Sequence, residues 1–198
     1  FYNWEYVTKL LENQSPFHLP EELICYHPKT IGFLVGELIK KITKKTIGQF
    51  LLESISIPLK VDCFIGTPKK FHSNIANLIS SPSLKKAFSD PSNIDEYTMK
   101  SFLNPGNRTK TANTEKYRLA EIPALNCHSN ARSLALIYDH FLNNNFISHE
   151  TLNKVTLIEA KGNDQVMKRP MQWSPVGFSI GGGKLFGKSS NSFGHTGW

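Results

Sequence analysis

Tyr26 is the residue whose place in the sequence best suits proton-transfer chemistry. It is followed by His27 and Pro28, and Pro28 suits the first position of a helix because its φ is already helical and its missing N–H costs nothing there. The sequence therefore predicts a helix that begins directly after His27 and holds the Tyr26 phenol at its mouth. The alternative is an ordinary half-buried tyrosine whose hydroxyl is satisfied by a neighbouring group.

Two short patterns match known catalytic or nucleotide-binding motifs. Ser83 and Lys86 have the S-x-x-K spacing of a serine nucleophile and its base, and residues 182–189 match the phosphate-binding loop GxxxxGK[ST]. An S-x-x-K pair must open a buried helix, but the residues around Ser83 are polar and flanked by prolines. A phosphate-binding loop needs a following helix, and residues 190–194 lack helical periodicity. We interpret the first match as chance and the second as a hairpin turn.

The cysteines and histidines do not have the spacing of metal ligands. Cys25, Cys63 and Cys127 are widely separated and odd in number, and the seven histidines form no ligand motif such as H-E-x-x-H. We therefore expect no metal, no cofactor and no disulfide framework. The cysteine usage favours a reducing intracellular compartment, cytoplasmic or mitochondrial, but does not fix the localisation.

Charge and composition limit the class of partner. The net charge of +7 suggests nucleic acid, but the basic residues are scattered, and only Lys40, Lys41, Lys44 and Lys45 cluster. No RNA-binding aromatic motif, zinc finger or long basic helix accompanies them, so we expect a solvated basic surface and no nucleic-acid partner. Hydrophobic residues make up 39% and charged residues 20%, as in soluble globular chains, and no apolar run is long enough to span a membrane.

The apolar residues after Tyr26 repeat with the period of an amphipathic helix, and we expect this stripe to face a core. Gly32 and Gly36 lie one turn apart within the repeat and are poor helix formers, so a tight contact with another element would explain both. The members of the stripe are Ile31, Leu34, Val35, Leu38, Ile39 and Ile42.

The remaining patterns predict a mixed α and β fold. Residues 1–170 are expected to be mainly helical, with an irregular covering segment at 66–116 that is rich in Ser, Pro, Asn and Lys. Residues 171–198 contain short alternating segments around a glycine-rich turn, which predicts antiparallel strands. Helices are expected at Trp4–Leu11, after Thr46, after Asn130 and after Ser148, and a short strand at Val61–Ile65.

Three ordered segments resemble the β-lactamase-related serine hydrolases, a family that includes class C β-lactamases, DD-peptidases and a carboxylesterase-like branch with animal relatives. The segments run from Tyr26 to Glu37, from Ile122 to Ala135, and from Phe193 to Gly197. The resemblance implies an α/β sandwich with a helical domain, of which residues 1–198 would form a partial, C-terminal portion. In such a domain Tyr26 and the segment that starts at His195 line one cleft.

The resemblance also implies roles for individual residues. Tyr26 matches the tyrosine that relays protons to and from the catalytic serine, and His195-Thr196-Gly197 matches the K-T-G strand, with His195 in place of the lysine. Thr196 and Gly197 would contact the substrate, and the backbone N–H of Trp198 would donate to the oxyanion. A protonated His195 would lower the pKa of Tyr26, although less than a lysine does.

Two departures from the family pattern shape the functional expectation. Pro28 stands where β-lactamases and peptidases have an asparagine, which favours a small ester or amide substrate over a β-lactam. The family's S-x-x-K motif precedes the tyrosine by far more than the 25 residues available, so we expect the serine upstream of Phe1 and the fragment alone to be inactive. The alternatives are a non-catalytic scaffold or assembly protein of the same fold and, more distantly, a phosphate-loop or basic nucleic-acid-binding protein. A homo-oligomer is left open.

Overall fold

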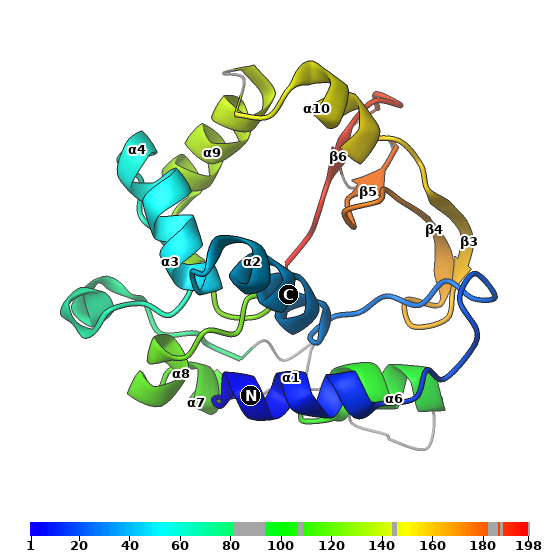
Figure 1. Cartoon of the computed structure of the whole chain (residues 1–198), viewed down its shortest axis with the longest axis horizontal. Coiled ribbons are helices and arrows are strands. Elements are labelled where there is room, and N and C mark those ends of the chain that lie inside the picture. Colours follow the sequence, from blue (N-terminus) through cyan, green and yellow to red (C-terminus); the bar gives the residue numbers. More distant parts are fainter. Residues whose placement is uncertain (81–93, 107–108, 144–145, 182–185, 187, 198) are drawn as a thin grey trace. The chain divides into compact units, whose positions relative to one another are not determined.

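The computed structural model describes residues 1–80, 94–106, 109–143, 146–181, 186 and 188–197 (Figure 1). The chain divides into two compact units, one made of Phe1–Pro16 and His27–Tyr138 and the other of Phe17–Tyr26 and Asp139–Trp198. The described residues form helices and two antiparallel sheets, so the predicted mixed α and β class is confirmed. Ser83, Lys86, most of the 182–189 motif and Trp198 lie outside the described residues.

The first unit begins with two helices that pack against each other. Helix α1 (Trp4–Asn13) is capped by the Asn3 side chain, which accepts from the Tyr6 N–H at 3.0 Å. Helix α2 (Ile31–Thr43) begins at Ile31, so the predicted start directly after His27 is wrong. The physical reason is Lys29, which is buried and donates to the carbonyls of Phe102, at 2.6 Å, and Pro105. Residues 28–30 therefore form a turn that directs the Lys29 side chain into the unit, and the helix begins after this turn.

The face of α2 that is buried differs from the predicted one. Phe33 is 0% exposed and Gly36 is buried, whereas Ile31, Leu34, Val35, Leu38 and Ile42 are exposed, Ile42 by 72%. The Phe33 ring packs at 5.5 Å from the ring of Phe1 and 5.0 Å from that of Trp4, so a bulky aromatic contact sets the rotation of the helix. The expected stripe toward the core is therefore wrong for these five residues.

The two glycines of α2 make the tight contacts that the sequence predicted. A Cβ at Gly32 would lie 2.6 Å from the backbone nitrogen of Ala124, and a Cβ at Gly36 would run into the indole of Trp4. The Trp4 Nε1 donates to Glu37 at 2.6 Å and fixes the indole over Gly36. The helix can approach α1 and the 122–125 segment this closely only because neither position carries a side chain.

Short helices and one small sheet complete the first unit. Strand β1 (Cys63–Phe64) pairs antiparallel with β2 (His128–Ser129), within the predicted strand at Val61–Ile65. Thr46 caps the helix that follows it, as predicted, and also forms a capping box with Gln49. Asn130 caps its own helix by accepting from the Ser133 N–H, also as predicted. The helices are α3 (Ile47–Leu51), a π-helical turn (Leu52–Ser56), α4 (Ile57–Leu59), a 3-10 helix (Lys69–Asn74), α6 (Glu96–Leu103), α7 (Thr109–Ala112), α8 (Glu115–Leu119) and α9 (Ala131–Asn143), whose end belongs to the second unit.

The core of the first unit is a small apolar cluster. Val7, Phe33 and Ile122 are buried together, and Trp4 and Leu125 are among the half-buried residues packed against them. The segment after α8 is held by the buried Asn126, which accepts from the Ile122 N–H at 3.0 Å and donates to the carbonyls of Tyr117 and Ala120. The asparagine of the Ile122–Asn126 motif thus has a structural role in this unit.

The second unit is built on a four-stranded antiparallel sheet in the order β3-β4-β5-β6. Strands β5 and β6 pair around the glycine-rich segment, which confirms the predicted antiparallel strands there. The sheet begins at Ala160, whereas the sequence predicted strands of this sheet only from residue 171. The Ala160–Asp164 segment lacks the β-branched residues typical of a strand, so the sequence did not indicate one there. Its extended conformation comes from pairing with β4. The elements are α10 (His149–Val155), β3 (Ala160–Asp164), β4 (Arg169–Trp173), β5 (Ser179–Ile180) and β6 (Phe193–Gly194). The division of the chain at residue 170 into functional parts stays a prediction.

Two findings bear on membranes and metals. Among the described residues, no helix combines the length and apolar character that a bilayer crossing requires. Within the same residues, no group of three or more His, Cys, Asp or Glu side chains is arranged to hold a metal ion.

Candidate active site

Tyr26 is held against the β3–β4 hairpin by the backbone that precedes it. Ile24 forms a parallel bridge with Asp164 at the end of β3, and the Gln165 N–H donates to the Ile24 carbonyl at 2.8 Å. The extended segment that ends at Tyr26 therefore runs beside the hairpin. This pairing sets the distance and direction from which the Tyr26 ring reaches the sheet.

Three rings from distant parts of the sequence meet in this unit. The Tyr26 ring stacks on Trp173 of β4, with ring centroids 5.5 Å apart and planes inclined by 7°. His195, which follows β6, has its ring centroid 5.6 Å from that of Tyr26 and 6.2 Å from that of Trp173. We call Tyr26, Trp173 and His195 the ring cluster. The structure thus brings together the tyrosine and the histidine that the family resemblance singled out.

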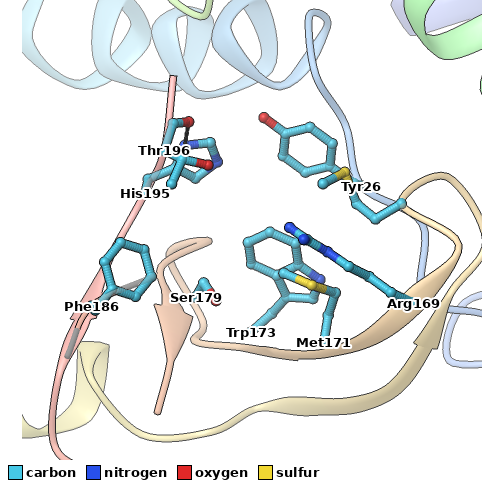
Figure 2. A pocket seen from close by; sticks show the side chains of 9 residues that line it. Tyr26, Arg169, Met171, Trp173, Ser179, Phe186, His195 and Thr196 are labelled. Atoms are coloured by element: carbon cyan, nitrogen blue, oxygen red, sulfur yellow. Dashed lines mark hydrogen bonds between the residues drawn. The ribbon is translucent and has the colours of Figure 1, made fainter. Parts of the chain in front are cut away.

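The ring cluster lines a small pocket (Figure 2). The Tyr26 hydroxyl points toward the side of the pocket where His195 and Thr196 lie, and Ser179 lies lower in the pocket, near Trp173. The free volume is about 10 Å³, room for roughly one water molecule, whereas small-molecule sites usually measure hundreds of Å³. The lining residues are Tyr26, Met167, Arg169, Met171, Trp173, Ser179, Phe186, His195 and Thr196.

The other two predicted site residues are placed differently. Gly197 is exposed and follows Thr196, but it is not among the residues that line the pocket. Trp198 lies outside the described residues, so its proposed contribution to an oxyanion site stays a prediction.

Asp164 organises the hairpin below the ring cluster. Its side chain is 1% exposed and accepts from the backbone N–H groups of Val166 and Met167, each at 2.8 Å. The same carboxylate accepts from the Trp173 Nε1 at 3.2 Å, which fixes the indole on which Tyr26 stacks. With these three donors, the hydrogen-bonding capacity of the buried carboxylate is well satisfied.

The pKa of Tyr26 moves in the direction opposite to the expected one. Burial of the phenol raises its pKa above the usual 10, and the Asp164 carboxylate raises it further. The net shift is thus upward, with a negative charge among its causes. The lowering expected from a protonated His195 stays a prediction. At neutral pH the Tyr26 hydroxyl keeps its proton.

His195 is oriented by its own backbone neighbour. Its Nδ1 lies 2.7 Å from the Thr196 carbonyl oxygen, which can only accept, so Nδ1 carries a proton. In the neutral ring the Nε2 atom then holds the free lone pair. In this tautomer Nε2 is the hydrogen-bond acceptor of the imidazole, whose ring centroid lies 5.6 Å from that of Tyr26.

Sequence reasoning missed several residues of the pocket. Arg169, Met171 and Trp173 line it together because residues two apart on a strand point to the same face. That alternation was the available signal, but Arg-Pro-Met-Gln-Trp is a weak strand pattern and no motif pointed to it. Asp164 had no signal, since its role arises only from the hairpin.

Replacing Asp164 with asparagine is expected to lower the pKa of Tyr26. The substitution removes the negative charge but leaves an oxygen that can still accept from Val166 and Met167, so the hairpin turn is retained. The pKa of Tyr26 in the folded state exceeds that in the unfolded chain, so the wild-type protein loses stability as pH rises above about 10. The Asp164→Asn protein should lose less stability over the same pH range. Tyrosinate absorbance titrations, with Tyr26→Phe to identify the signal, measure the shift.

Tyr117 provides the control for this titration. Its pKa is also raised, by burial and by Tyr2, and both groups belong to the other unit. Asp164→Asn should leave the Tyr117 signal unchanged. An equal shift of both tyrosines would mean that the substitution loosens the protein instead of removing a local charge.

Comparison with solved structures identifies the class of fold. The chain has the fold of the β-lactamase-related serine hydrolases, which confirms the resemblance drawn from the sequence. A family VIII carboxylesterase matches with a TM-score of 0.88 and 26% sequence identity, over 100% of this chain and 53% of that protein. No family model and no curated protein matches the chain.

Two further solved structures share the fold. A penicillin-binding protein homolog from Caulobacter crescentus matches with a TM-score of 0.79 and 24% identity, over 100% of this chain and 53% of that one. EstA from Arthrobacter nitroguajacolicus Rue61a matches with a TM-score of 0.81 and 21% identity, over 98% of this chain and 53% of that one. The chain thus spans about half the length of each of these three proteins.

Proposed function

We propose that the chain is part of a serine hydrolase that cleaves a small ester or amide through an acyl-enzyme. The observation that carries the proposal is the ring cluster, in which Tyr26 and His195 meet although they come from opposite ends of the sequence. The family resemblance assigns proton transfer to Tyr26 and places His195 where the family has the lysine of its K-T-G strand. The similarity to a carboxylesterase supports the same reaction class.

The proposed mechanism uses this chain for proton transfer and not for nucleophilic attack. A serine supplied by another part of the longer protein attacks the substrate carbonyl, and its proton must leave as the bond to carbon forms. The raised pKa keeps Tyr26 protonated at neutral pH, so the phenol cannot act as the resting base. We assign the proton-accepting site to His195 Nε2, with the Tyr26 hydroxyl passing the proton between serine, imidazole and leaving group.

The remaining assignments follow the family pattern. The backbone N–H of Trp198 is proposed as an oxyanion donor, with Thr196 and Gly197 contacting the substrate. The small volume of the pocket fits a site of which its lining residues, Tyr26, His195 and Thr196 among them, form one wall, with the serine on the other. Pro28 offers no side-chain donor, which supports an ester or simple amide over a β-lactam.

Labelling with a fluorophosphonate tests the proposal. In the longer protein we expect one covalently labelled serine outside residues 1–198, and with residues 1–198 alone we expect no labelling. Ser179 is the matched control, because it lines the pocket but sits on a strand and has no assigned nucleophilic role. Ser179→Ala should leave the labelling intact. Failure of the longer protein to react would instead support the non-catalytic scaffold of the same fold.

A further inference from the structure

Two cysteines far apart in the sequence meet in the first unit. The Sγ atoms of Cys63 and Cys127 lie 3.5 Å apart, although the residues are separated by 64 positions. Cys63 begins β1 and Cys127 directly precedes β2, so the pairing of the two strands brings them together. No disulfide joins the two sulfurs in this structure. The wide spacing of the cysteines gave no sign of this contact.

The backbone on both sides of the thiol pair is held in place. The Ser56 hydroxyl donates to the Cys63 carbonyl at 2.6 Å, and the Ser129 hydroxyl donates to the Asp62 carbonyl at 2.6 Å. The Asp62 N–H in turn donates to the Ser133 hydroxyl at 3.1 Å. Hydrogen bonds that cross between the strands and their neighbouring helices therefore maintain the proximity of the sulfurs.

The two sulfurs differ in ways that suit thiol chemistry. Cys63 is 4% exposed, whereas Cys127 is exposed at the surface. The hydrogen bond from the Cys127 thiol outweighs burial and lowers the pKa of Cys63 to about 7, while it raises the pKa of Cys127. A thiolate is the nucleophile in thiol–disulfide chemistry, and here it has a second thiol in contact.

We propose that Cys63 and Cys127 form a reversible dithiol–disulfide pair that is oxidised by hydroperoxides and reduced by small or protein dithiols. In the forward reaction one thiolate attacks the peroxide O–O bond, which gives a sulfenic acid and releases an alcohol or water. The second thiol attacks the sulfenic sulfur, the S–S bond forms and water leaves. Two thiols thus lose two electrons to one peroxide. The sulfurs must approach by about 1.5 Å to reach bonding distance.

The disulfide would change the stability of the first unit. It would close the chain between β1 and β2 into a loop that contains α6, α7 and α8. Closing a loop of this length restricts the unfolded chain, so the oxidised form should melt about 5–10 °C above the reduced form. A dithiol reductant would break this bond and so restore the lower melting temperature of the reduced form.

Peptide mapping after peroxide treatment tests the proposal. The folded protein is treated with hydrogen peroxide, free thiols are alkylated, and the proteolytic peptides that contain Cys25, Cys63 and Cys127 are identified. We expect a linked peptide that joins Cys63 to Cys127, a Cys25 that remains alkylated, and full reversal by dithiothreitol. Cys25→Ser should retain the link and the melting shift, whereas Cys63→Ser and Cys127→Ser should lose both.

The wild-type protein alone can overturn the proposal, which matters if a cysteine variant fails to fold. Oxygen added to separate cysteines without a linked peptide would show that the sulfurs cannot close. A link to Cys25 or between two molecules would show that the contact is not the reactive one. A link that forms but leaves the melting temperature unchanged would contradict the structural consequence.

Discussion

Under the proposed function, replacing Tyr26 by phenylalanine is expected to lower kcat/KM for ester hydrolysis by about 10²–10⁴-fold in the longer protein. The substitution removes only the hydroxyl that passes the proton, and the ring that stacks on Trp173 remains. The loss should appear mainly in kcat, because the missing step belongs to the chemistry and not to substrate binding. Steady-state hydrolysis of a nitrophenyl ester measures it.

Tyr138→Phe is the matched control for this experiment. Tyr138 is an exposed tyrosine on α9 and is not among the residues that line the pocket, so its hydroxyl should be dispensable. Near-ultraviolet circular dichroism would verify that the Tyr26→Phe protein keeps its aromatic packing. Turnover unchanged by Tyr26→Phe would remove the phenol from the mechanism and leave the ring cluster as packing alone.

The site residues that the sequence could predict are those that belong to recognisable sequence motifs. Tyr26 and His195 were identified because each stands in a short ordered pattern that resembles a known family. Asp164 and Trp173 were not, although one sets the charge beside the phenol and the other provides the surface on which it stacks. Their roles depend on the register of a hairpin, and no local pattern encodes that register.

The direction of the Tyr26 pKa shift shows the same limit. The family pattern suggested a cationic partner, and substitution of the lysine by His195 was expected only to weaken its effect. The structure adds a buried carboxylate and a desolvated ring, and both act in the opposite direction. Charge at a site is a sum over residues brought together by the fold, so one residue of a motif cannot determine it.

Helices were easier to predict than their orientation. The periodic pattern located α2 to within a few residues and the paired glycines correctly indicated a tight contact. The pattern could not show which side of the helix faces the core, because an apolar stripe does not indicate which other residues are close enough to pack against it. In the first unit the aromatic rings of Phe1 and Trp4 provide that partner, and they meet Phe33 instead of the stripe.

The orientation of α2, with Phe33 facing the core, leads to a second prediction with a large expected effect. Phe33→Ala should lower the free energy of unfolding of the first unit by about 3–5 kcal/mol, because it removes a fully buried ring from the core and leaves a cavity beside Trp4. Leu38→Ala, on the same helix, removes a side chain that is 57% exposed, so its cost should stay below about 1 kcal/mol.

Denaturant unfolding of the two variants, followed by tryptophan fluorescence, measures the difference. Alanine is the better helix former, so any loss at Leu38 beyond about 1 kcal/mol must come from contacts that the side chain makes in solution. Equal losses of stability at Phe33 and Leu38 would show that the face of α2 that carries Leu38 is covered in solution, by a second copy or by another part of the longer protein. A small loss at Phe33 would contradict the packing of α2 itself.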